Sequence, residues 1–441
     1  MFSRRNRRPT SPELAAAWEC LDGGDVPGAL RRLRQTPSAP LGEVAAVVGR
    51  AAGAAGAAGF DDLRRAAVAL AAHPDRVRLL HDYGYACVER GVPYLAIPAL
   101  REALRLAPGS SGTLRELVSA YEDEGRHREA ADALLAHEGG LADWPDRYLL
   151  VFNAVLAGDL ELARRQHARL PGPDEDVWLG ARDRQNRVLE RAATAGPVSP
   201  LDHSDLRGWQ YVMGGTVLGT LSPHGYDAGM TGRYAWFQDS HDQCLQGLLR
   251  LKAVLGAAGA RPASVSLLPD RGSRILGLAA AEVLGLPAEP FAAGREDTVV
   301  IAYDLGDTAR AAQGPEVIRQ LLHRVPGQVL HEHASCWTDP PGVAADSVTL
   351  LHQSVVPPWG ETLRLGDDGE AERGEADGRP EAEIAADIVG ADPTPDGGDG
   401  ETPADPVEKL TDFVSAVRGT WLRGDRAGLR SPGPVTSSRF L

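Results

Sequence analysis

The chain has few of the features that mark secreted, disulfide-stabilised or membrane-spanning proteins. Four cysteines are spread over 441 residues, and we expect reduced thiols, because structural disulfides belong to oxidising compartments. No apolar run approaches the roughly 20 residues that a membrane-spanning helix needs, so the sequence predicts no membrane partner and a cytoplasmic location. No Walker A, G-x-S-x-G or G-x-G-x-x-G motif occurs, which removes the commonest nucleotide-binding and hydrolase signals.

Lysine is also scarce, and arginine carries nearly all the positive charge. With abundant alanine, glycine and proline, this bias is typical of GC-rich coding and indicates a bacterial source. The formal net charge of −15 argues against a nucleic-acid partner. Most of it lies in residues 366–406, which hold 14 acidic residues and two arginines, a net charge of −12. The rest of the chain is therefore close to neutral.

A glycine followed five residues later by an alanine recurs at a spacing close to 34 residues. The pairs are Gly24 and Ala29, Gly91 and Ala96, Gly125 and Ala130, and Gly158 and Ala163. The glycine permits a tight turn after one helix, and the alanine lets the next helix lie close against it. The pattern resembles the tetratricopeptide repeat (TPR) family and predicts an all-α, TPR-like solenoid over residues 11–190, with a degenerate hairpin at 40–75. An unrelated helical bundle with a coincidental period is the alternative.

Stacked hairpins of this family leave a concave groove lined by the first helix of each pair. The resemblance therefore implies a protein or peptide partner. We expect the groove to be lined by Tyr83, Arg115, Tyr121 and Asn153.

The second half of the chain changes character after a linker at 191–204. Residues 209–223 are rich in β-branched and aromatic residues with glycines, as strands and turns are. Predicted helices at 239–259, 271–287 and 315–325 then alternate with predicted strands at 264–269, 298–305, 327–335 and 347–356. This alternation predicts an α/β domain over 205–363 with a mostly parallel sheet.

Two passages of this half, taken in order, resemble the phosphoribosyltransferase family. Asp270, Arg271, Gly272 and Ser273 form a polar turn after the strand at 264–269, and Asp304, Gly306, Asp307 and Thr308 follow the strand at 298–305. In that family the first turn carries Arg-Gly, and the later strand ends in two acids and a threonine-containing phosphate loop. The resemblance implies a phosphate and ribose site at Arg271, Gly272, Asp304, Asp307 and Thr308.

The match to that family is incomplete. Tyr303 stands in place of the first acid, and residues 309–311 replace the glycine-containing close of the loop. Bulkier residues there should crowd a phosphate, so we assign no catalytic residue and no cofactor. The sequence favours a scaffold protein whose α/β domain binds or senses a small molecule without catalysis. The alternative is an active transferase regulated by its TPR domain.

Histidines and cysteines of this half raise the question of a metal site. His331, His333 and Cys336 could combine with His241 and Cys244, or with His352, as zinc ligands. No C-x-x-C pair is present and no spacing matches a known zinc finger. The sequence therefore predicts no bound metal and favours partly buried polar residues at strand ends.

The remaining segments are predicted from composition. Residues 1–10 should be a basic disordered start, 364–404 an acidic disordered linker and 425–441 a disordered end. Between the last two, residues 405–424 should form an amphipathic helix with Asp405 as N-cap. Its apolar stripe is Val407, Leu410, Phe413, Val414, Val417 and Trp421.

Overall fold

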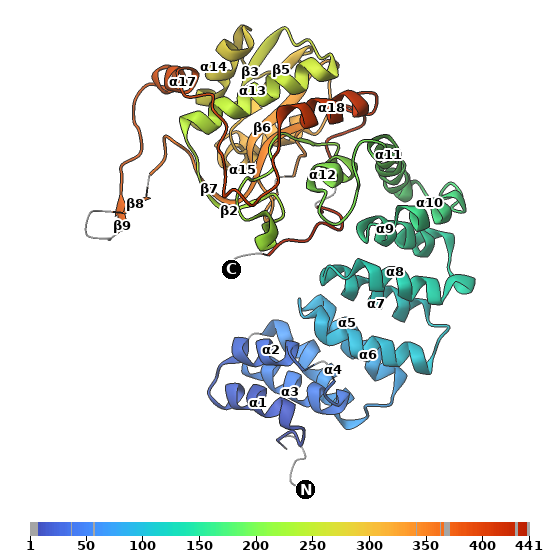
Figure 1. Ribbon diagram of the computed structural model, residues 1–441. Helices are drawn as coiled ribbons and strands as arrows, with labels where there is room; N and C mark the ends of the chain where they lie inside the picture. Colours follow the sequence, from blue (N-terminus) through green and yellow to red (C-terminus); the bar gives the residue numbers. More distant parts are fainter. Residues whose placement is uncertain are drawn as a thin grey trace. The chain divides into compact units, whose positions relative to one another are not determined.

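The computed structural model describes residues 8–36, 38–55, 58–340, 342–361, 363–365, 371–427 and 431–438. The chain forms two compact units, Met1–Asp174 and Glu175–Leu441 (Figure 1). The first consists of helical hairpins and the second contains a mostly parallel sheet, which confirms the predicted fold class. Within the described residues no helix is both long enough and apolar enough to cross a membrane.

The first unit is a series of antiparallel helix pairs. Its α-helices are α1 (Ala15–Asp22), α2 (Val26–Arg34), α3 (Leu41–Ala54), α4 (Asp61–Ala72), α5 (Val77–Glu89), α6 (Pro93–Leu106), α7 (Ser111–Asp123), α8 (His127–Ala136), α9 (Tyr148–Leu156) and α10 (Leu160–Ala168). Each helix packs on the next along the chain, and α7 also packs on α5. This is the arrangement of TPR-like repeats, and α3 and α4 form the hairpin predicted at 40–75.

The small residues of the repeat have the predicted roles. Gly91 and Gly125 adopt positive φ values of 70° and 67° where the first helix of a pair ends, a conformation that costs glycine little. Gly84 lies so close to Leu100 that a Cβ there would be 2.5 Å from the leucine side chain. Ala96 is fully buried between helices. The small residues that recur every 34 residues or so therefore form both the tight turns and the close contacts between the two helices of a pair.

The second unit is organised around a parallel sheet. Its strands are β1 (Val217–Leu218), β2 (Tyr234–Gln238), β3 (Ser264–Leu267), β4 (Ala288–Pro290), β5 (Thr298–Ala302), β6 (Val329–Cys336) and β7 (Ser347–Val356). They lie in the order β4-β3-β5-β6-β7, with β1 and β2 both paired to the outer edge of β7. A separate antiparallel hairpin joins β8 (Leu363–Leu365) to β9 (Ala371–Arg373). The strands expected at 264–269, 298–305, 327–335 and 347–356 are confirmed.

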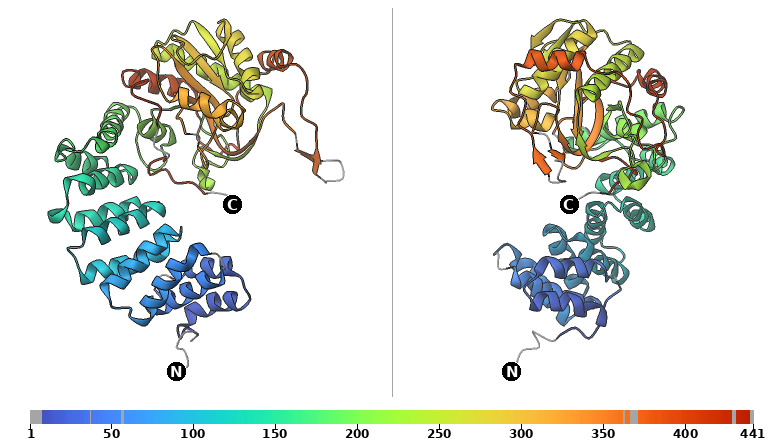
Figure 2. Two further views of the ribbon diagram at one scale, coloured as in Figure 1. Left: turned by 180° about the vertical axis from the view of Figure 1, so that it is seen from behind. Right: turned by 60° about the vertical axis from the view of Figure 1, so that its left-hand side comes forward.

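Helices cover both faces of this sheet, as its buried strands require. The helices of the unit are α11 (Leu179–Ala195), α12 (Leu206–Gly214), α13 (His241–Ala258), α14 (Arg271–Leu284), α15 (Leu305–Arg310), α16 (Gly314–Leu321), α17 (Glu381–Val389) and α18 (Val407–Val417). Helices α13 and α14 pack on one face of the sheet. Helix α15 packs on β6, and α16 packs on α15. Figure 2 shows the sheet between these layers.

The start of the second unit differs from the prediction. Helix α11 continues through part of the expected linker at 191–204, and it belongs to the second unit although the solenoid was expected to reach residue 190. Residues 209–214, expected as strand and turn, lie in helix α12. Asp205 caps this helix by accepting a hydrogen bond from the Gly208 N–H at 2.9 Å. Burial of Trp209, Tyr211 and Val212 outweighs their β propensity.

The acidic segment is the largest correction. Disorder was predicted for 364–404; residues 366–370 lie outside the described part, but residues 381–389 form α17, which packs on α14. Ile384 and Ile388 are fully buried there, so this short stretch has enough apolar surface to fold against a neighbour. Glu381 forms an ion pair with Arg274 at 2.6 Å, so part of the acidic charge is paired.

The last part of the chain is also attached. The amphipathic helix is confirmed as α18, with Leu410, Phe413 and Val417 buried. Asp405 is not its cap: its carboxylate instead forms ion pairs with Arg207 at 2.9 Å and Arg250 at 3.2 Å. These buried guanidinium groups explain why the acid turns away from the helix.

Disorder of 425–441 is wrong for residues 425–427 and 431–438. The side chain of Arg426 is completely buried and lies 2.9 Å from the Asp346 carboxylate, and Val435 is fully buried. Residues 1–7, 428–430 and 439–441 lie outside the described part of the chain.

Candidate functional site

The carboxyl edge of the parallel sheet gathers the polar residues of the second unit. Strand β4 lies on one side of β3, and the chain then crosses over so that β5 lies on the other side of β3. In open α/β sheets, ligands bind beyond the carboxyl ends of the strands at such a switch point. Residues 271–273, predicted as a turn, form the first turn of α14, which Asp270 caps. The switch point lies between this helix N-terminus and the residues after β5, Tyr303 and Asp304.

The residues predicted from the family resemblance do meet at this edge. Strand β5 lies centrally between β3 and β6, as expected. The Tyr303 N–H donates to Ser273 Oγ at 3.0 Å, and the Thr308 hydroxyl donates to Asp270 Oδ2 at 2.7 Å. Asp304 caps α15 by accepting from the Gly306 N–H at 2.6 Å. The two predicted passages are therefore joined directly by hydrogen bonds.

The expected phosphate loop, however, is helical. Asp307 and Thr308 lie within α15. The Thr308 side chain is buried, while Asp307 pairs with Arg310 at 2.5 Å on the surface. An open loop with converging amides is not formed by these residues, since the bulky side chains around them suit a helix better than a phosphate cradle.

Arg271 and Gly272 are covered by the chain itself. The Arg271 guanidinium donates to the carbonyl oxygens of Asp377 and Arg379 at 2.8 and 2.9 Å. Gly272 faces Trp359, whose ring meets the Tyr303 ring edge-on at a centroid distance of 4.9 Å. The segment after β7 thus occupies the side of the turn that a phosphate was expected to use.

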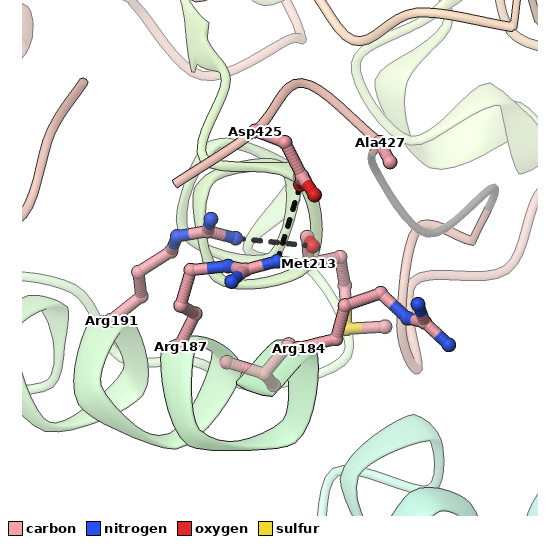
Figure 3. A pocket seen from close by; sticks show the side chains of 8 residues that line it. Arg184, Arg187, Arg191, Met213, Asp425 and Ala427 are labelled. Atoms are coloured by element: carbon pink, nitrogen blue, oxygen red, sulfur yellow. Dashed lines mark hydrogen bonds and ion pairs between the residues drawn. The ribbon is translucent and has the colours of Figure 1, made fainter. Parts of the chain in front are cut away.

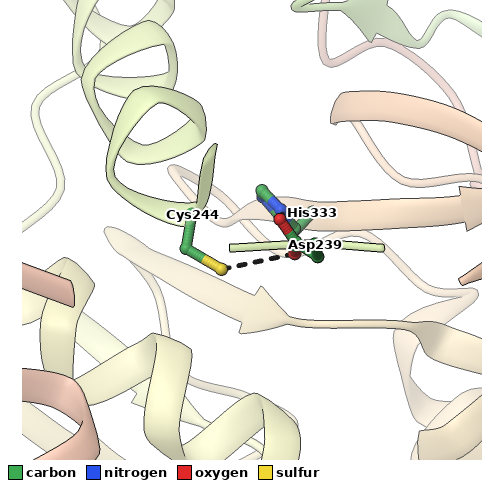
Figure 4. Close-up of side chains that lie close together, drawn as sticks. All are labelled: Asp239, Cys244 and His333. Carbon is green, nitrogen blue, oxygen red and sulfur yellow. Dashed lines mark hydrogen bonds and ion pairs between the residues drawn. The ribbon is translucent and has the colours of Figure 1, made fainter. Parts of the chain in front are cut away.

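A second cluster lies on the face of the sheet covered by α13 (Figure 4). Asp239 follows β2, Cys244 lies in the first turn of α13 and His333 lies on β6. Asp239 Oδ2 accepts hydrogen bonds from Tyr303 Oη at 2.9 Å, His333 Nε2 at 3.0 Å and Cys244 Sγ at 3.4 Å. The three side chains can each offer one metal-ligating atom, with these atoms within 4.8 Å of one another.

Burial dominates the protonation of this cluster. It raises the pKa of the Cys244 thiol and of the Tyr303 phenol well above their usual values, and the nearby Asp239 carboxylate raises both further. Outside the cluster but next to His333 in the chain, burial lowers the pKa of His331 to about 3, and the charge of His333 lowers it further. The His331 imidazole is therefore neutral at pH 7.

The opposite face carries a third buried group. Glu332 accepts a hydrogen bond from the Leu305 N–H at 2.7 Å, and His352 Nε2 lies 3.6 Å from Asp304 Oδ2. Burial, and then the negative charge of Asp304, raise the pKa of Glu332 to about 8. Glu332 thus lies beside Asp304, which follows β5, and Asp304 in turn approaches His352, which lies within β7.

Sequence reasoning missed the residues that connect these groups. Asp239 and Tyr303 were not named as a pair, because nothing in the spacing of 64 residues indicates that they touch. Of the histidines and cysteines weighed as zinc ligands, His333 and Cys244 come together, whereas His331, Cys336, His241 and His352 do not join the described cluster. Asp239 and Cys244, which begin and end the sequence DSHDQC, were the available signal.

A pocket of the second unit lies elsewhere (Figure 3). It is lined by Arg184, Arg187 and Arg191 of α11, by Asp425, and by Met213 and Gly214 just before β1. Arg187 pairs with Asp425 at 3.2 Å, and Arg191 donates to the Val212 and Met213 carbonyl oxygens. The pocket is beside the amino end of β1, so it is separate from the carboxyl edge of the sheet.

In the first unit, three of the predicted groove residues lie in the core. Tyr83, Tyr121 and Asn153 are at most 4% exposed, so they cannot line a groove. Asn153 Nδ2 donates to Glu122 at 2.6 Å, and its Oδ1 lies 3.0 Å from His127 Nδ1. Arg115 is partly exposed but pairs with Asp146 at 2.6 Å. These residues connect helices to one another.

Other residues of α5 and α7 reach the surface. Tyr85 is 48% exposed, and Glu89 follows it by one helical turn. Burial raises the pKa of Glu116 on α7, and nearby Glu89 raises it further although His81 opposes this. Glu89, Glu116 and Asp123 have no ion-pair partner in the described part of the chain. We call Tyr85, Glu89, Glu116 and Asp123 the α5–α7 acidic face.

The chain was compared with family models, curated proteins and solved structures, and only solved structures are similar to it. No family model matches the chain, and neither does any curated protein. Among solved structures, MamA AMB-1 is similar at 21% identity over 36% of this chain and 96% of its own, with a TM-score of 0.24. MamA MSR-1 is similar at 22% identity over 34% of this chain and 87% of its own, with a TM-score of 0.23. At these scores neither likeness carries an argument about function.

Proposed function

We propose that the protein is a scaffold that binds a basic peptide segment of another protein on the α5–α7 acidic face. The observation that carries this proposal is that α5 and α7 bear a half-exposed tyrosine and three carboxylates without a described ion-pair partner, two of which, Glu89 and Glu116, are close enough to interact. Arginine and lysine side chains complement such carboxylates, and the tyrosine ring can pack against their alkyl parts or receive a cation–π contact.

The arrangement of the helices supports this reading. Helices α5 and α7 pack side by side and are joined by a hydrogen bond between His81 and Thr113 at 3.2 Å. Their side chains therefore keep fixed positions, so a peptide would not have to order them on binding. A preorganised face loses less conformational entropy and binds more tightly for the same contacts.

The test measures binding of arginine-rich and charge-neutral peptides to the full chain by fluorescence anisotropy. Arginine-rich peptides should bind, with an affinity that falls as salt is raised. A Glu89→Lys, Glu116→Lys variant should bind at least about tenfold more weakly, because attraction becomes repulsion. The control is Glu102→Lys on α6, where Glu102 is already paired with Arg105 at 2.7 Å. Equal losses in both variants would contradict the proposal.

For the second unit we propose a non-catalytic ligand-binding or sensing role at the carboxyl edge. The hydrogen bonds that join the residues after β5 to the N-terminus of α14 support a phosphoribosyl-type ligand, and the covered Arg271 and helical α15 weigh against turnover. Binding should be weak, because one acid cannot hold both ribose hydroxyls and α15 replaces the phosphate loop. Phosphoribosyl pyrophosphate with magnesium should therefore raise the melting temperature only slightly and without turnover. A clear rise that is lost in Asp304→Asn, with turnover of a base, would instead favour the alternative of a TPR-regulated transferase.

A further inference from the structure

We propose that Asp239, Cys244 and His333 form a zinc site inside the second unit. The site lies in the other unit from the peptide-binding face, and Tyr303 Oη, which donates to Asp239 Oδ2 at 2.9 Å, connects it to the β3–β5 switch point. Its three side chains come from segments that are distant in sequence but meet on the α13 side of the sheet (Figure 4).

The spacing of the donor atoms suits a single small ion. Zinc bonds of about 2.0–2.1 Å to oxygen and nitrogen and about 2.3 Å to sulfur place tetrahedral neighbours about 3.3–3.6 Å apart. Here Asp239 Oδ2 lies 3.0 Å from His333 Nε2 and 3.4 Å from Cys244 Sγ. These two sides need to lengthen by only a few tenths of an ångström to reach that range. The third side, from Cys244 Sγ to His333 Nε2, is within 4.8 Å.

The charge balance of the cluster also calls for a cation. The side chains of Asp239 and His333 are completely buried. Within the described residues, Asp239 has no arginine or lysine partner; its ion-pair contact is His333, which is charged only if protonated. A buried carboxylate is normally paired or bound to a metal. Zinc would supply the missing positive charge.

The hydrogen bonds around Asp239 lead to the same conclusion. Three donors approach the single oxygen Oδ2, whereas a carboxylate oxygen has about two lone-pair sites. If zinc lies between Oδ2, Nε2 and Sγ, the His333 and Cys244 contacts with Oδ2 are no longer hydrogen bonds, because all three atoms bind the ion instead. The remaining donor, Tyr303 Oη, then orients the carboxylate, as outer hydrogen bonds do in metal sites.

The surrounding fold positions the ligands. Ser240 caps α13 by accepting from the Gln243 N–H at 3.2 Å, which places Cys244 in the first turn above Asp239. A Cβ at Gly247 would lie 2.6 Å from His333 Nδ1, so the helix backbone presses on that side of the ring. Nδ1 has no hydrogen-bond partner within the described residues, and Nε2 is the atom that points to the site.

The donor set selects the class of metal. One sulfur, one nitrogen and one oxygen suit zinc, whereas magnesium and calcium prefer oxygen alone. Three protein ligands leave one coordination position for water or another donor. On binding, the Cys244 thiol loses its proton to solvent as the zinc–sulfur bond forms. This reverses the expectation from sequence that no metal binds, because Asp239 was missing from the sets considered there.

The test is elemental analysis of the full chain produced with zinc and dialysed into metal-free buffer. We expect about one zinc per chain, reduced to background in Cys244→Ala and in Asp239→Asn. Cys336→Ala is the matched control, since Cys336 lies on the neighbouring end of β6 outside the cluster, and it should retain the metal. Background zinc in the unmodified chain, or loss only in Cys336→Ala, would overturn the proposal.

A second measurement needs no variant and therefore does not depend on variant folding. Cobalt loaded into the unmodified chain should give the near-ultraviolet charge-transfer band of a thiolate ligand and visible bands of four-coordinate cobalt. Cobalt that binds without a thiolate band, or does not bind, would show that Cys244 is not a ligand and would overturn the site.

Discussion

Buried polar side chains hold neighbouring helices of the repeat unit in register. Asn153 is the clearest case, because it is fully buried and its amide contacts both Glu122 on α7 and His127 on α8. Each contact joins one hairpin to the next. A residue that was expected to touch a partner therefore stabilises the stacking on which a binding face depends.

His127 should make the repeat unit sensitive to acid. Burial lowers the pKa of His127, although the hydrogen bond that its Nδ1 makes to Asn153 Oδ1 opposes the shift. Since the folded-state pKa is below the unfolded value of about 6.5, the unfolded chain binds the proton more tightly, and stability falls as pH drops below that value. Chemical denaturation at pH 7 and pH 5.5 should show a smaller loss in His127→Gln than in the unmodified chain. An identical loss would contradict this role.

Arg426 should be the residue that anchors the end of the chain. It donates two hydrogen bonds to the Asp346 carboxylate, at 3.1 and 2.9 Å, and its side chain is completely buried. Arg324 also pairs with Asp346, at 2.7 Å, so the acid keeps one cation when Arg426 is removed. The loss of the buried hydrogen bonds to a charged group should still lower the free energy of unfolding of Arg426→Ala by about 2 kcal/mol.

The matched control for that change is Arg423→Ala three residues earlier. Arg423 is 60% exposed in its pair with Glu190, and exposed pairs contribute little. Thermal denaturation should therefore shift clearly in Arg426→Ala and hardly at all in Arg423→Ala. Similar shifts would show that Arg426 is not a buried anchor.

At the scale of elements, the sequence predicted those whose pattern follows from local geometry. The glycine and alanine period located the hairpins around Gly91 and Gly125, because turn and close approach need small residues at fixed positions. Strands β3, β5, β6 and β7 were predictable from short apolar runs. Helix α12 was not, because its aromatic and β-branched residues favour strands until burial in the folded unit decides otherwise.

The site was harder to predict than the fold. Asp304 and the 270–273 turn were found because both follow apolar strands. The contacts of Asp239 with Tyr303 and His333 depend on strand order, which no local pattern contains. Helix α17 was missed because composition averaged over a long acidic segment hides Ile384 and Ile388.

Helix α17 should protect its segment from proteolysis. Its buried isoleucines pack on α14, so Ile388→Asp would place a charge in an apolar contact and release the helix. Limited proteolysis followed by mass spectrometry should show new cuts within 381–404 in that variant. The exposed change Glu383→Ala should leave the pattern of the unmodified chain, and equal cutting in all three proteins would indicate that α17 is not held in place.

At the scale of the whole molecule, the two compact units divide the proposed roles. The repeat unit offers the α5–α7 acidic face, and the α/β unit gathers buried polar groups at the carboxyl edge of its sheet. Each unit has its own core. Binding of a partner and occupancy of a ligand or metal site can thus be measured separately.

The most direct measurement of the binding proposal is site-specific photocrosslinking on the full chain. A photoreactive phenylalanine analogue placed at Tyr85 should crosslink to a bound arginine-rich peptide. The same analogue placed at Leu106 on α6 should not, although Leu106 is comparably exposed, at 39% against 48%. Crosslinks at position 106 alone, or equally at both positions, would contradict binding on the α5–α7 acidic face.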